Sequence, residues 1–242
     1  MSTENTDYEA LKKRGFLRSK HEGYFTLRTR IPAGNYTKSH LKKIAEISEK
    51  YGKGTVHLTV RQGIEIPFIK SEDIDRVERE IKAAGIFPGT SGARLRVITC
   101  CPGNNWCKQG LVNTFSLLDR VENDRGIRCG MDLPHKFKIA VSGCPNACTR
   151  VQSSEVGVHG EIDTAHPGKK AGYAVYLGGN GGRIPREGFK LDGVFTEDAV
   201  LVLVEKAIKF YKENAKPRQR FGSLIEETGR EDFLRAIGES RV

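Results

Sequence analysis

Residues 101–107 read Cys-Pro-Gly-Asn-Asn-Trp-Cys, and residues 143–148 read Gly-Cys-Pro-Asn-Ala-Cys. Gly, Pro and Asn favour turns, so neither stretch forms a regular helix or strand, and both cysteine pairs are predicted to lie on tight loops. Backbone N–H groups in such loops turn inward and can donate hydrogen bonds to thiolate or sulfide. Because four cysteine thiolates are the ligand set of a [4Fe–4S] cluster, the two pairs indicate a redox protein.

Other uses of these cysteines fit their surroundings less well. Zinc knuckles are commonly built on C-x2-C pairs, whereas the spacings here are C-x5-C and C-x3-C. Disulfides need an oxidising compartment, and residues 1–15 contain no apolar signal core, so we expect a cytoplasmic chain with reduced thiols. Buried, unreactive cysteines remain an alternative. Of the other two cysteines, Cys100 is expected to pack inward, and Cys129 is either a packed thiol or a neighbour of the site.

The composition is that of an ordinary globular chain with a basic excess. Its 242 residues are 38% hydrophobic, without an apolar run that could span a membrane, so no membrane partner is expected. The net charge of +10 favours anionic partners such as a polycarboxylate cofactor. The short basic runs lack the interleaved aromatic residues of a single-strand-binding face, so we expect no nucleic-acid partner.

The first half of the chain has the element order of a ferredoxin-like split unit. A strand is predicted at 24–30, followed by a helix capped by Thr37. Two short strands at 55–60 and 64–69 follow, and Ser71 is the candidate cap of a second helix. This order, β-α-β-β-α, predicts a half-domain that packs two helices on a small sheet.

The second half mixes strands and helices around the two cysteine loops. Strands are expected at 95–98, 137–141 and 171–177. Helices are expected at 111–123, from a cap at Thr196 to Asn214, and once or twice within 217–242. The predicted class is α+β. The predicted domains are an N-terminal arm or short helix (1–20), a ferredoxin-like half-domain (21–90) and a cluster-binding α/β domain (91–242).

Basic residues on predicted strands lie close in sequence to the cysteine loops. Side chains two apart on a strand share a face, which applies to Arg28 with Arg30 and to Lys136 with Lys138. Arg96 lies on the strand expected to lead to the first loop. Each pair is either the solvent face of a half-buried strand, which is the commoner case, or part of an anion-binding pocket beside a redox centre. The position of the lysines just before the second loop favours a pocket there.

These motifs resemble those of the sulfite and nitrite reductases that carry sirohaem and a [4Fe–4S] cluster. The agreement with that family extends over roughly residues 15–228. It includes the cysteine pairs, the Lys-Phe-Lys sequence at 136–138 and the sequence around them. Further matching stretches are 27–32, 58–62, 141–148, 155–158, 177–180 and 183–185. The resemblance implies a ferredoxin-like half-domain followed by a sirohaem and [4Fe–4S] reductase domain.

The resemblance also implies roles for individual residues. The expected cluster ligands are Cys101, Cys107, Cys144 and Cys148. In the family the last of these cysteines also bridges to the sirohaem iron, a role that would fall to Cys148. The residues expected to hold the oxyanion are Arg30, Arg96, Lys136 and Lys138. The residues expected to meet sirohaem carboxylates are Arg61, Asn180 and Arg183.

The implied activity is the six-electron reduction of sulfite to sulfide. Nitrite reduction at the same type of site is one alternative, and a non-catalytic subunit that carries the cofactors is another; a nucleic-acid-binding protein with a structural cluster is weaker still. The sequence contains no C-x2-C-x2-C-x3-C insertion for further clusters, so an external, ferredoxin-like carrier is expected to supply the electrons. The nearest resemblance is to the small, single-unit sulfite reductases of anaerobes.

The family usually carries two copies of this half-domain and cluster-domain unit, whereas this chain has one. In the two-copy proteins, cysteines from one unit and the Arg/Lys set largely from the other surround one sirohaem. A two-fold homodimer would restore that arrangement, and closed two-fold pairing is the commonest soluble assembly. A monomer with an open sirohaem cleft is the competing expectation.

Overall fold

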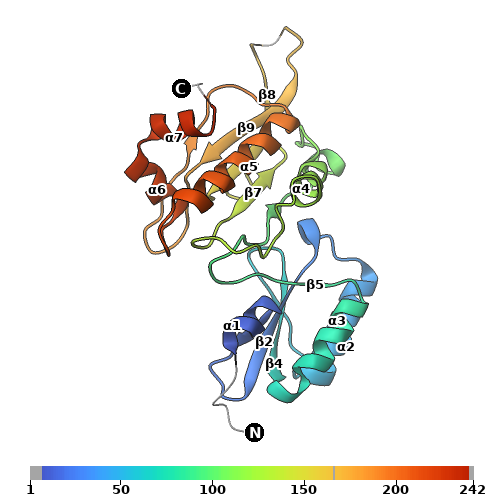
Figure 1. Cartoon of the computed structure of the whole chain (residues 1–242). Coiled ribbons are helices and arrows are strands. Elements are labelled where there is room, and N and C mark those ends of the chain that lie inside the picture. The colour runs from blue at the N-terminus through green and yellow to red at the C-terminus, as the bar shows by residue number, and fades with distance from the viewer. Residues whose placement is uncertain (1–6, 166, 240–242) are drawn as a thin grey trace. The chain divides into compact units, whose positions relative to one another are not determined.

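The computed structural model of this chain describes residues 7–165 and 167–239. The chain divides into two compact units, residues 1–92 and 93–242. Each unit combines helices with a five-stranded sheet, in agreement with the predicted α+β class (Figure 1).

The sheet of the first unit is antiparallel and has the order β1-β2-β4-β3. Its strands are β1 (Phe16–Arg18), β2 (Tyr24–Arg30), β3 (His57–Leu58), β4 (Ile64–Lys70) and β5 (Phe87–Pro88). β5 pairs with the last two residues of β2. The predicted strands at 24–30 and 64–69 are confirmed, whereas only His57 and Leu58 of the predicted strand at 55–60 pair with β4.

The helices of the first unit are α1 (Tyr8–Lys13), α2 (Lys38–Tyr51) and α3 (Ile74–Ala83). The Thr37 hydroxyl accepts the His40 N–H at 3.2 Å, which confirms the predicted cap of α2. The prediction for Ser71 was wrong: Ser71 opens a 3-10 turn, and α3 begins at Ile74 without a side-chain cap. α1 and β1 occupy much of the predicted arm, of which residues 1–6 lie outside the described part.

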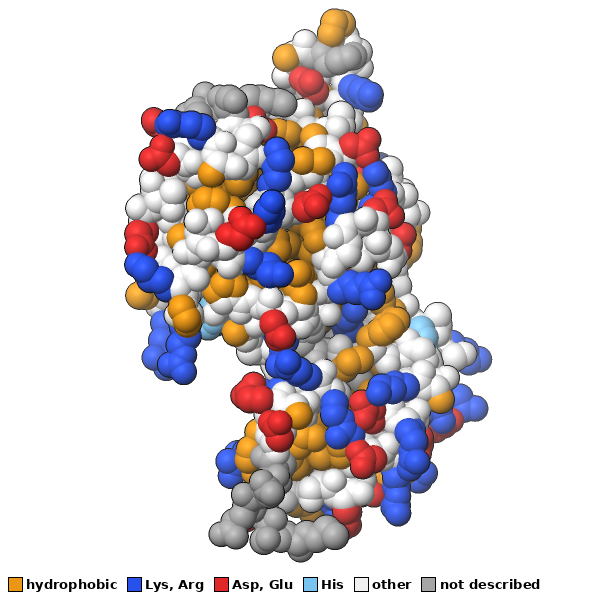
Figure 2. Space-filling model, viewed as in Figure 1, with side chains coloured by type: hydrophobic (Ala, Val, Ile, Leu, Met, Phe, Trp, Pro, Cys, Tyr) orange, Lys and Arg blue, Asp and Glu red, His pale blue; other side chains and the backbone are white. Residues whose placement is uncertain are grey.

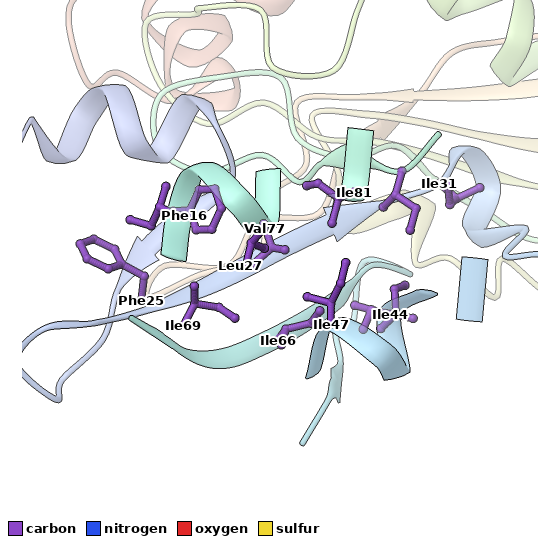
Figure 3. Close-up of a cluster of buried hydrophobic side chains, with 13 residues drawn as sticks. Phe16, Phe25, Leu27, Ile31, Ile44, Ile47, Ile66, Ile69, Val77 and Ile81 are labelled. Carbon is purple, nitrogen blue, oxygen red and sulfur yellow. The ribbon is translucent and has the colours of Figure 1, made fainter. Parts of the chain in front are cut away.

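A single apolar cluster of 13 side chains joins the first unit's sheet to its helices (Figure 3). Leu27 and Ile66 from neighbouring strands are fully buried and meet Ile47 of α2 and Val77 of α3. Burying such side chains stabilises a fold by about 1.5–3 kcal/mol each, so this cluster fixes β2 and the turns at its end.

The second unit's sheet has the order β10-β9-β8-β7-β6. Its strands are β6 (Thr99–Cys100), β7 (Ile139–Ser142), β8 (Val156–Ile162), β9 (Ala171–Leu177) and β10 (Phe189–Lys190). β6, β7 and β8 are parallel, and β9 is antiparallel to both of its neighbours. The prediction of a strand at 95–98 was wrong, because only Leu95 forms an isolated bridge and the ladder begins at Thr99.

The helices of the second unit are α4 (Thr114–Asn123), α5 (Glu197–Asn214), α6 (Phe221–Thr228) and α7 (Arg230–Ala236). The predicted cap at Thr196 is confirmed, since its hydroxyl accepts the Ala199 N–H at 3.3 Å. α4 begins three residues later than predicted, where the Asn113 side chain caps it. α4 and α5 pack against each other and against the sheet (Figure 1).

Phe137 anchors the chain just before β7. Its ring is fully buried and lies 5.4 Å from the ring of Tyr211 on α5 and 5.2 Å from that of Phe221 on α6. Because strand side chains alternate, this burial directs Lys136 and Lys138 away from the aromatic cluster. None of the helices in the described part of the chain combines the length and the hydropathy needed to cross a lipid bilayer.

Candidate functional site

The two cysteine loops lie side by side at one edge of the second unit's sheet. Cys101 directly follows β6, and Cys144 follows β7, so both loops leave the carboxyl ends of adjacent parallel strands. The Gly143 N–H donates to Cys101 Sγ at 3.0 Å. The Leu111 N–H donates to the Gly143 carbonyl at 2.8 Å. These bonds hold the backbones of the two loops together.

Glycine is required where the two loops touch. A Cβ atom on Gly143 would lie 2.4 Å from the Gly103 Cα, and one on Gly110 would lie 2.2 Å from the Gly103 carbonyl carbon. Both distances are far below van der Waals contact, and backbone atoms cannot rotate aside. The loops therefore approach each other as closely as bare backbone permits.

The four motif thiols differ in exposure. Cys144 is buried, Cys101 is half-buried, and Cys107 and Cys148 are exposed. In residues 7–165 and 167–239, no group of three or more Cys, His, Asp or Glu side chains already surrounds a single metal position. The structure thus places the four thiols on two adjoining loops, with an N–H donor on one sulfur, but does not show them closed around one point. Sulfur donors with an inward N–H fit a thiolate-ligated cluster.

The loop that carries Cys148 has a fixed backbone. The neighbouring residues Ala147 and Arg150 have positive φ values of 49° and 59°, which non-glycine residues rarely adopt. The Ser142 hydroxyl at the end of β7 accepts the Thr149 N–H at 3.1 Å. Residues held in strained backbone conformations by the surrounding structure are often found at functional sites. This loop is therefore a candidate for such a site.

The other two cysteines lie inside the unit. Cys100 is 1% exposed, its thiol contacts the Thr114 carbonyl at 3.5 Å, and burial raises its pKa to about 12. The prediction that Cys100 packs inward is confirmed. Cys129 is half-buried, and its thiol donates to Glu122 Oε1 at 2.9 Å.

The only tryptophan of the sequence lies beside the first cysteine loop's exposed thiol. Trp106 precedes Cys107 and is 69% exposed. Its ring lies 5.3 Å from the ring of Phe115 at the start of α4. A large exposed aromatic side chain here contacts the solvent next to the cysteine loops.

A cationic pocket lies at a different edge of the same sheet. Its volume is about 370 Å³, and three segments line it: the residues before β7, the loop after β9 and the start of α6. The residues with charged or titratable side chains in its wall are His135, Lys136, Arg183, Arg186 and Arg220. Burial, followed by the charges of neighbouring Arg220 and Lys136, lowers the pKa of His135. The pocket therefore favours an anion.

Several predicted site residues meet at this pocket. Lys136, Asn180 and Arg183 line it, and Lys138 Nζ lies 3.7 Å from where a Cβ on Gly181 would stand. The charge of Arg96 also acts on His135. The Asn180 amide donates to the Ile184 carbonyl at 2.7 Å, so this side chain also shapes the loop.

The cysteine loops and the cationic pocket lie at opposite edges of the sheet. Lys138 immediately precedes β7, whereas Cys144 follows it, and the loop after β9 joins the lysines because β9 runs antiparallel to β8. At ~3.3 Å per strand residue, the backbones of Lys138 and Cys144 are about 20 Å apart. The structure therefore does not bring the lysines beside the cysteines of the same unit.

Arg30 and Arg61 belong to the first unit. Arg30 ends β2, is largely buried, and its guanidinium lies 5.1 Å from the Phe87 ring centre. Arg61 lies in the turn between β3 and β4, and a Cβ on nearby Gly63 would stand 2.5 Å from the Thr29 carbonyl oxygen beside Arg30. Arg28 pairs with Glu65 at 2.7 Å, so its charge is neutralised within the sheet.

Figure 2 shows Lys and Arg side chains interspersed with Asp and Glu over the visible face of each unit, so the basic excess is not collected in one patch there. No role was predicted from the sequence for His135, Arg186 and Arg220 in the pocket wall, or for the buried Glu155 behind it. Only Glu155 had a signal, since it opens the matching stretch at 155–158.

Two sequence families match this chain. Residues 18–84 match the nitrite/sulfite reductase ferredoxin-like half domain, and residues 91–242 match the nitrite and sulphite reductase 4Fe-4S domain. These matches confirm the predicted fold class.

Similar curated proteins include both sulfite and nitrite reductases. The coenzyme F420-dependent sulfite reductase of Methanocaldococcus jannaschii is 28% identical over 96% of this chain and 44% of its own length. The nitrite reductase [NAD(P)H] of Bacillus subtilis is 30% identical over 86% of this chain and 24% of its own length. The assimilatory-type sulfite reductase of Nitratidesulfovibrio vulgaris is 25% identical over 93% of this chain and 97% of its own length. The chain thus spans less than half of the first two relatives.

The fold is shared with solved structures of other proteins. Dissimilatory sulfite reductase I superimposes with a TM-score of 0.80 at 18% identity, over 90% of this chain and 70% of its own. The NirA protein of Mycobacterium tuberculosis superimposes with a TM-score of 0.82 at 18% identity, over 98% of this chain and 46% of its own.

The cofactors implied by these matches are a [4Fe–4S] cluster and sirohaem. The paired cysteine loops fit the first, and the cationic pocket fits the carboxylates of the second. With the 4Fe-4S domain matching residues 91–242, which are more than half of its length, the chain belongs to the nitrite and sulphite reductase family.

Proposed function

We propose that this chain reduces sulfite to sulfide. The observation that carries the proposal is the cationic pocket, whose wall contains Lys136, Arg183 and Arg220. It lies in the domain that matches the nitrite and sulphite reductase 4Fe-4S domain. The net reaction takes bisulfite, six electrons and six protons to hydrosulfide and three waters. It therefore needs a site that holds an anion and delivers protons as S–O bonds break.

The proposed cluster ligands are Cys101, Cys107, Cys144 and Cys148. Bound there, a [4Fe–4S] cluster coupled to sirohaem would supply electrons and an electrophilic iron. The role of the chain is to hold the thiols on two abutting loops and to place an N–H on the Cys101 sulfur. Cys148, on a constrained and exposed turn, is the proposed bridge to the sirohaem iron.

The proposed oxyanion-binding residues are Arg30, Arg96, Lys136 and Lys138. Arginine offers a planar fork that stays protonated, and lysine can both bind an anion and donate a proton from Nζ. The proposed partners of sirohaem carboxylates are Arg61, Asn180 and Arg183. In support, Asn180 and Arg183 share the wall of one pocket with Lys136.

Nitrite reduction is the second candidate. It is favoured by the similarity of this chain to nitrite reductases, such as that of Bacillus subtilis at 30% identity. Both anions are small and negatively charged, so the pocket suits either. Steady-state rates with each anion, measured with a reduced viologen dye on anaerobically purified protein, would separate them: a kcat/KM for nitrite far above that for sulfite would overturn the sulfite proposal. A full cofactor complement without turnover of either anion would favour a cofactor-carrying subunit.

The electrons are proposed to come from a separate, ferredoxin-like carrier. Beyond the four proposed ligands, the sequence contains only Cys100 and Cys129, too few for a second cluster. Both of these thiols lie within the second unit.

We further propose a homodimer with composite sites. The lysines and the cysteines lie at opposite edges of one sheet, so two chains could each present one edge to a shared sirohaem. Mixing Cys148→Ser chains with Lys138→Met chains tests this, because a heterodimer of two inactive chains regains one intact site. The absence of any recovery after verified subunit exchange, or an active monomer in sedimentation, would contradict the dimer.

A further inference from the structure

A fully buried carboxylate stands behind the cationic pocket. Glu155, just before β8, is 0% exposed. Its Oε2 accepts the backbone N–H of Lys138 at 2.8 Å, and its Oε1 forms an ion pair with Arg220. Its backbone carbonyl accepts the N–H of Gly178, where the pocket loop begins, at 3.0 Å. One residue therefore contacts all three segments that line the pocket.

Arg220 lies between this carboxylate and the pocket. It occupies the N-cap position of α6 and lines the pocket wall. Its NH2 group faces Glu155, whereas its NH1 group lies 3.8 Å from where a Cβ on Gly182 would stand. The guanidinium thus has one edge on the buried carboxylate and another toward the loop that closes the pocket.

The geometry of the Arg220 guanidinium leaves it able to bind a second anion. A guanidinium has five N–H donors in a planar fork, and the bond to Glu155 is made by Nη2. The N-cap residue of α6 is Arg220, and its side chain does not cap the first N–H groups of the helix, so the helix end adds partial positive charge at the same place. The buried Glu155 charge needs a partner, which explains why Arg220 stays at the wall.

We infer that Arg220 is a further anion-binding residue of the pocket and that Glu155 is the positioning residue that holds it. The ligand chemistry is a carboxylate or an oxyanion, which could come from the tetrapyrrole's carboxylates or from sulfite. This inference rests on the proposed function. Because Glu155 accepts the Lys138 N–H, it would also fix the position of the Lys138 backbone. Glu155 would in this way connect the lysines to Arg220.

The test uses the complete, anaerobically purified protein and three variants: Arg220→Gln, Glu155→Gln and the double variant. Two quantities are measured: the tetrapyrrole retained per chain after dialysis at high salt, and the dissociation constant of sulfite from a visible titration. Arg120→Gln is the matched control, because Arg120 also pairs with a carboxylate, Glu197, in the same unit but away from the pocket.

Arg220→Gln is expected either to lower the tetrapyrrole retained per chain or to raise the dissociation constant of sulfite. The change should be about tenfold or more, as is typical for loss of a hydrogen bond to a charged group. Lower tetrapyrrole retention would identify the cofactor carboxylates as the ligand, and weaker sulfite binding at full loading would identify the oxyanion. Because the single variant leaves the buried Glu155 carboxylate without its cationic partner, the double variant controls for misfolding.

The double variant decides between anion binding and a purely structural role. If Arg220 binds the anion and Glu155 acts through it, the double variant should be as weak as Arg220→Gln alone. Recovery of wild-type binding would mean that Arg220 only neutralises Glu155, and losses that add would mean that Glu155 acts independently of Arg220; either result overturns the inference. So would an Arg220→Gln variant that matches Arg120→Gln in both measurements. A wild-type protein without tetrapyrrole would instead refute the proposed function before any variant is made.

Discussion

Replacing Gly143 by alanine should disrupt the cysteine loops by sterics alone. The new Cβ would stand 2.4 Å from the Gly103 Cα, about 1 Å inside the 3.4 Å at which ordinary contact begins. Neither side can yield easily, because the Gly143 carbonyl already accepts the Leu111 N–H and lies 2.3 Å from where a Cβ on Gly160 would stand. Overpacking of this kind costs about 1–3 kcal/mol. The backbone of Gly143 does not have a positive φ, so no conformational strain is added.

The assay is acid-labile sulfide per chain, which counts the cluster and not the sirohaem iron, together with the midpoint of urea unfolding. We expect Gly143→Ala to lose more than half of its labile sulfide and to unfold at lower urea. Gly181→Ala is the control, because its Cβ would meet only Lys138 Nζ, at an ordinary 3.7 Å. If Gly143→Ala keeps full labile sulfide and unfolds like the control, the close contact between the loops is not what holds the site.

Further predictions concern the thiols, the lysines and one histidine. Cys148→Ser should lower labile sulfide per chain, whereas Cys100→Ser should not, because Cys100 is buried against α4; equal losses would contradict the proposed ligand set. Lys136→Met and Lys138→Met should each raise the barrier to turnover by about 2.7–4 kcal/mol with both cofactors bound, and unchanged kcat would return these lysines to a solvent-face role. The folded state lowers the pKa of His135 below its ordinary 6.5, so folding favours the neutral imidazole. The stability that this preference contributes is present above pH 6.5 and is lost as the pH falls through the lowered pKa. His135→Gln should therefore lessen the fall in the unfolding midpoint between about pH 7 and about pH 5, and an unaltered pH dependence would refute that assignment.

Local signals in the sequence predicted much of the fold. Thr37 and Thr196 mark helix starts because their hydroxyls accept backbone N–H groups three residues on, which needs no tertiary information. The strand at 24–30 was predicted from its alternation alone. β8 was missed, because its sequence Val-Gly-Val-His-Gly-Glu-Ile contains two glycines and is largely buried, so it lacks a regular alternation.

The candidate site was predictable only in part. The spacing of the cysteines indicates a cluster whatever the strand order, whereas the meeting of Asn180 and Arg183 with the lysines depends on the antiparallel direction of β9. Residues 95–98 have the sequence pattern of a strand, yet the pairing of β6 with β7 begins only at Thr99. That register depends on the partner strand and not on the local sequence. The pair of Glu155 and Arg220 joins residues 65 apart in the chain, and no local pattern reports such a contact.

Trp106 gives this protein its own optical reporter. As the only tryptophan of the sequence, exposed and next to Cys107, it is the sole source of indole fluorescence and lies on the loop that would bind the cluster. A metal cluster or a tetrapyrrole absorbs where indole emits, so energy transfer would quench this emission when either group binds nearby. Cofactor assembly could then be followed in real time on the unlabelled chain, and Trp106→Phe would provide the dark control.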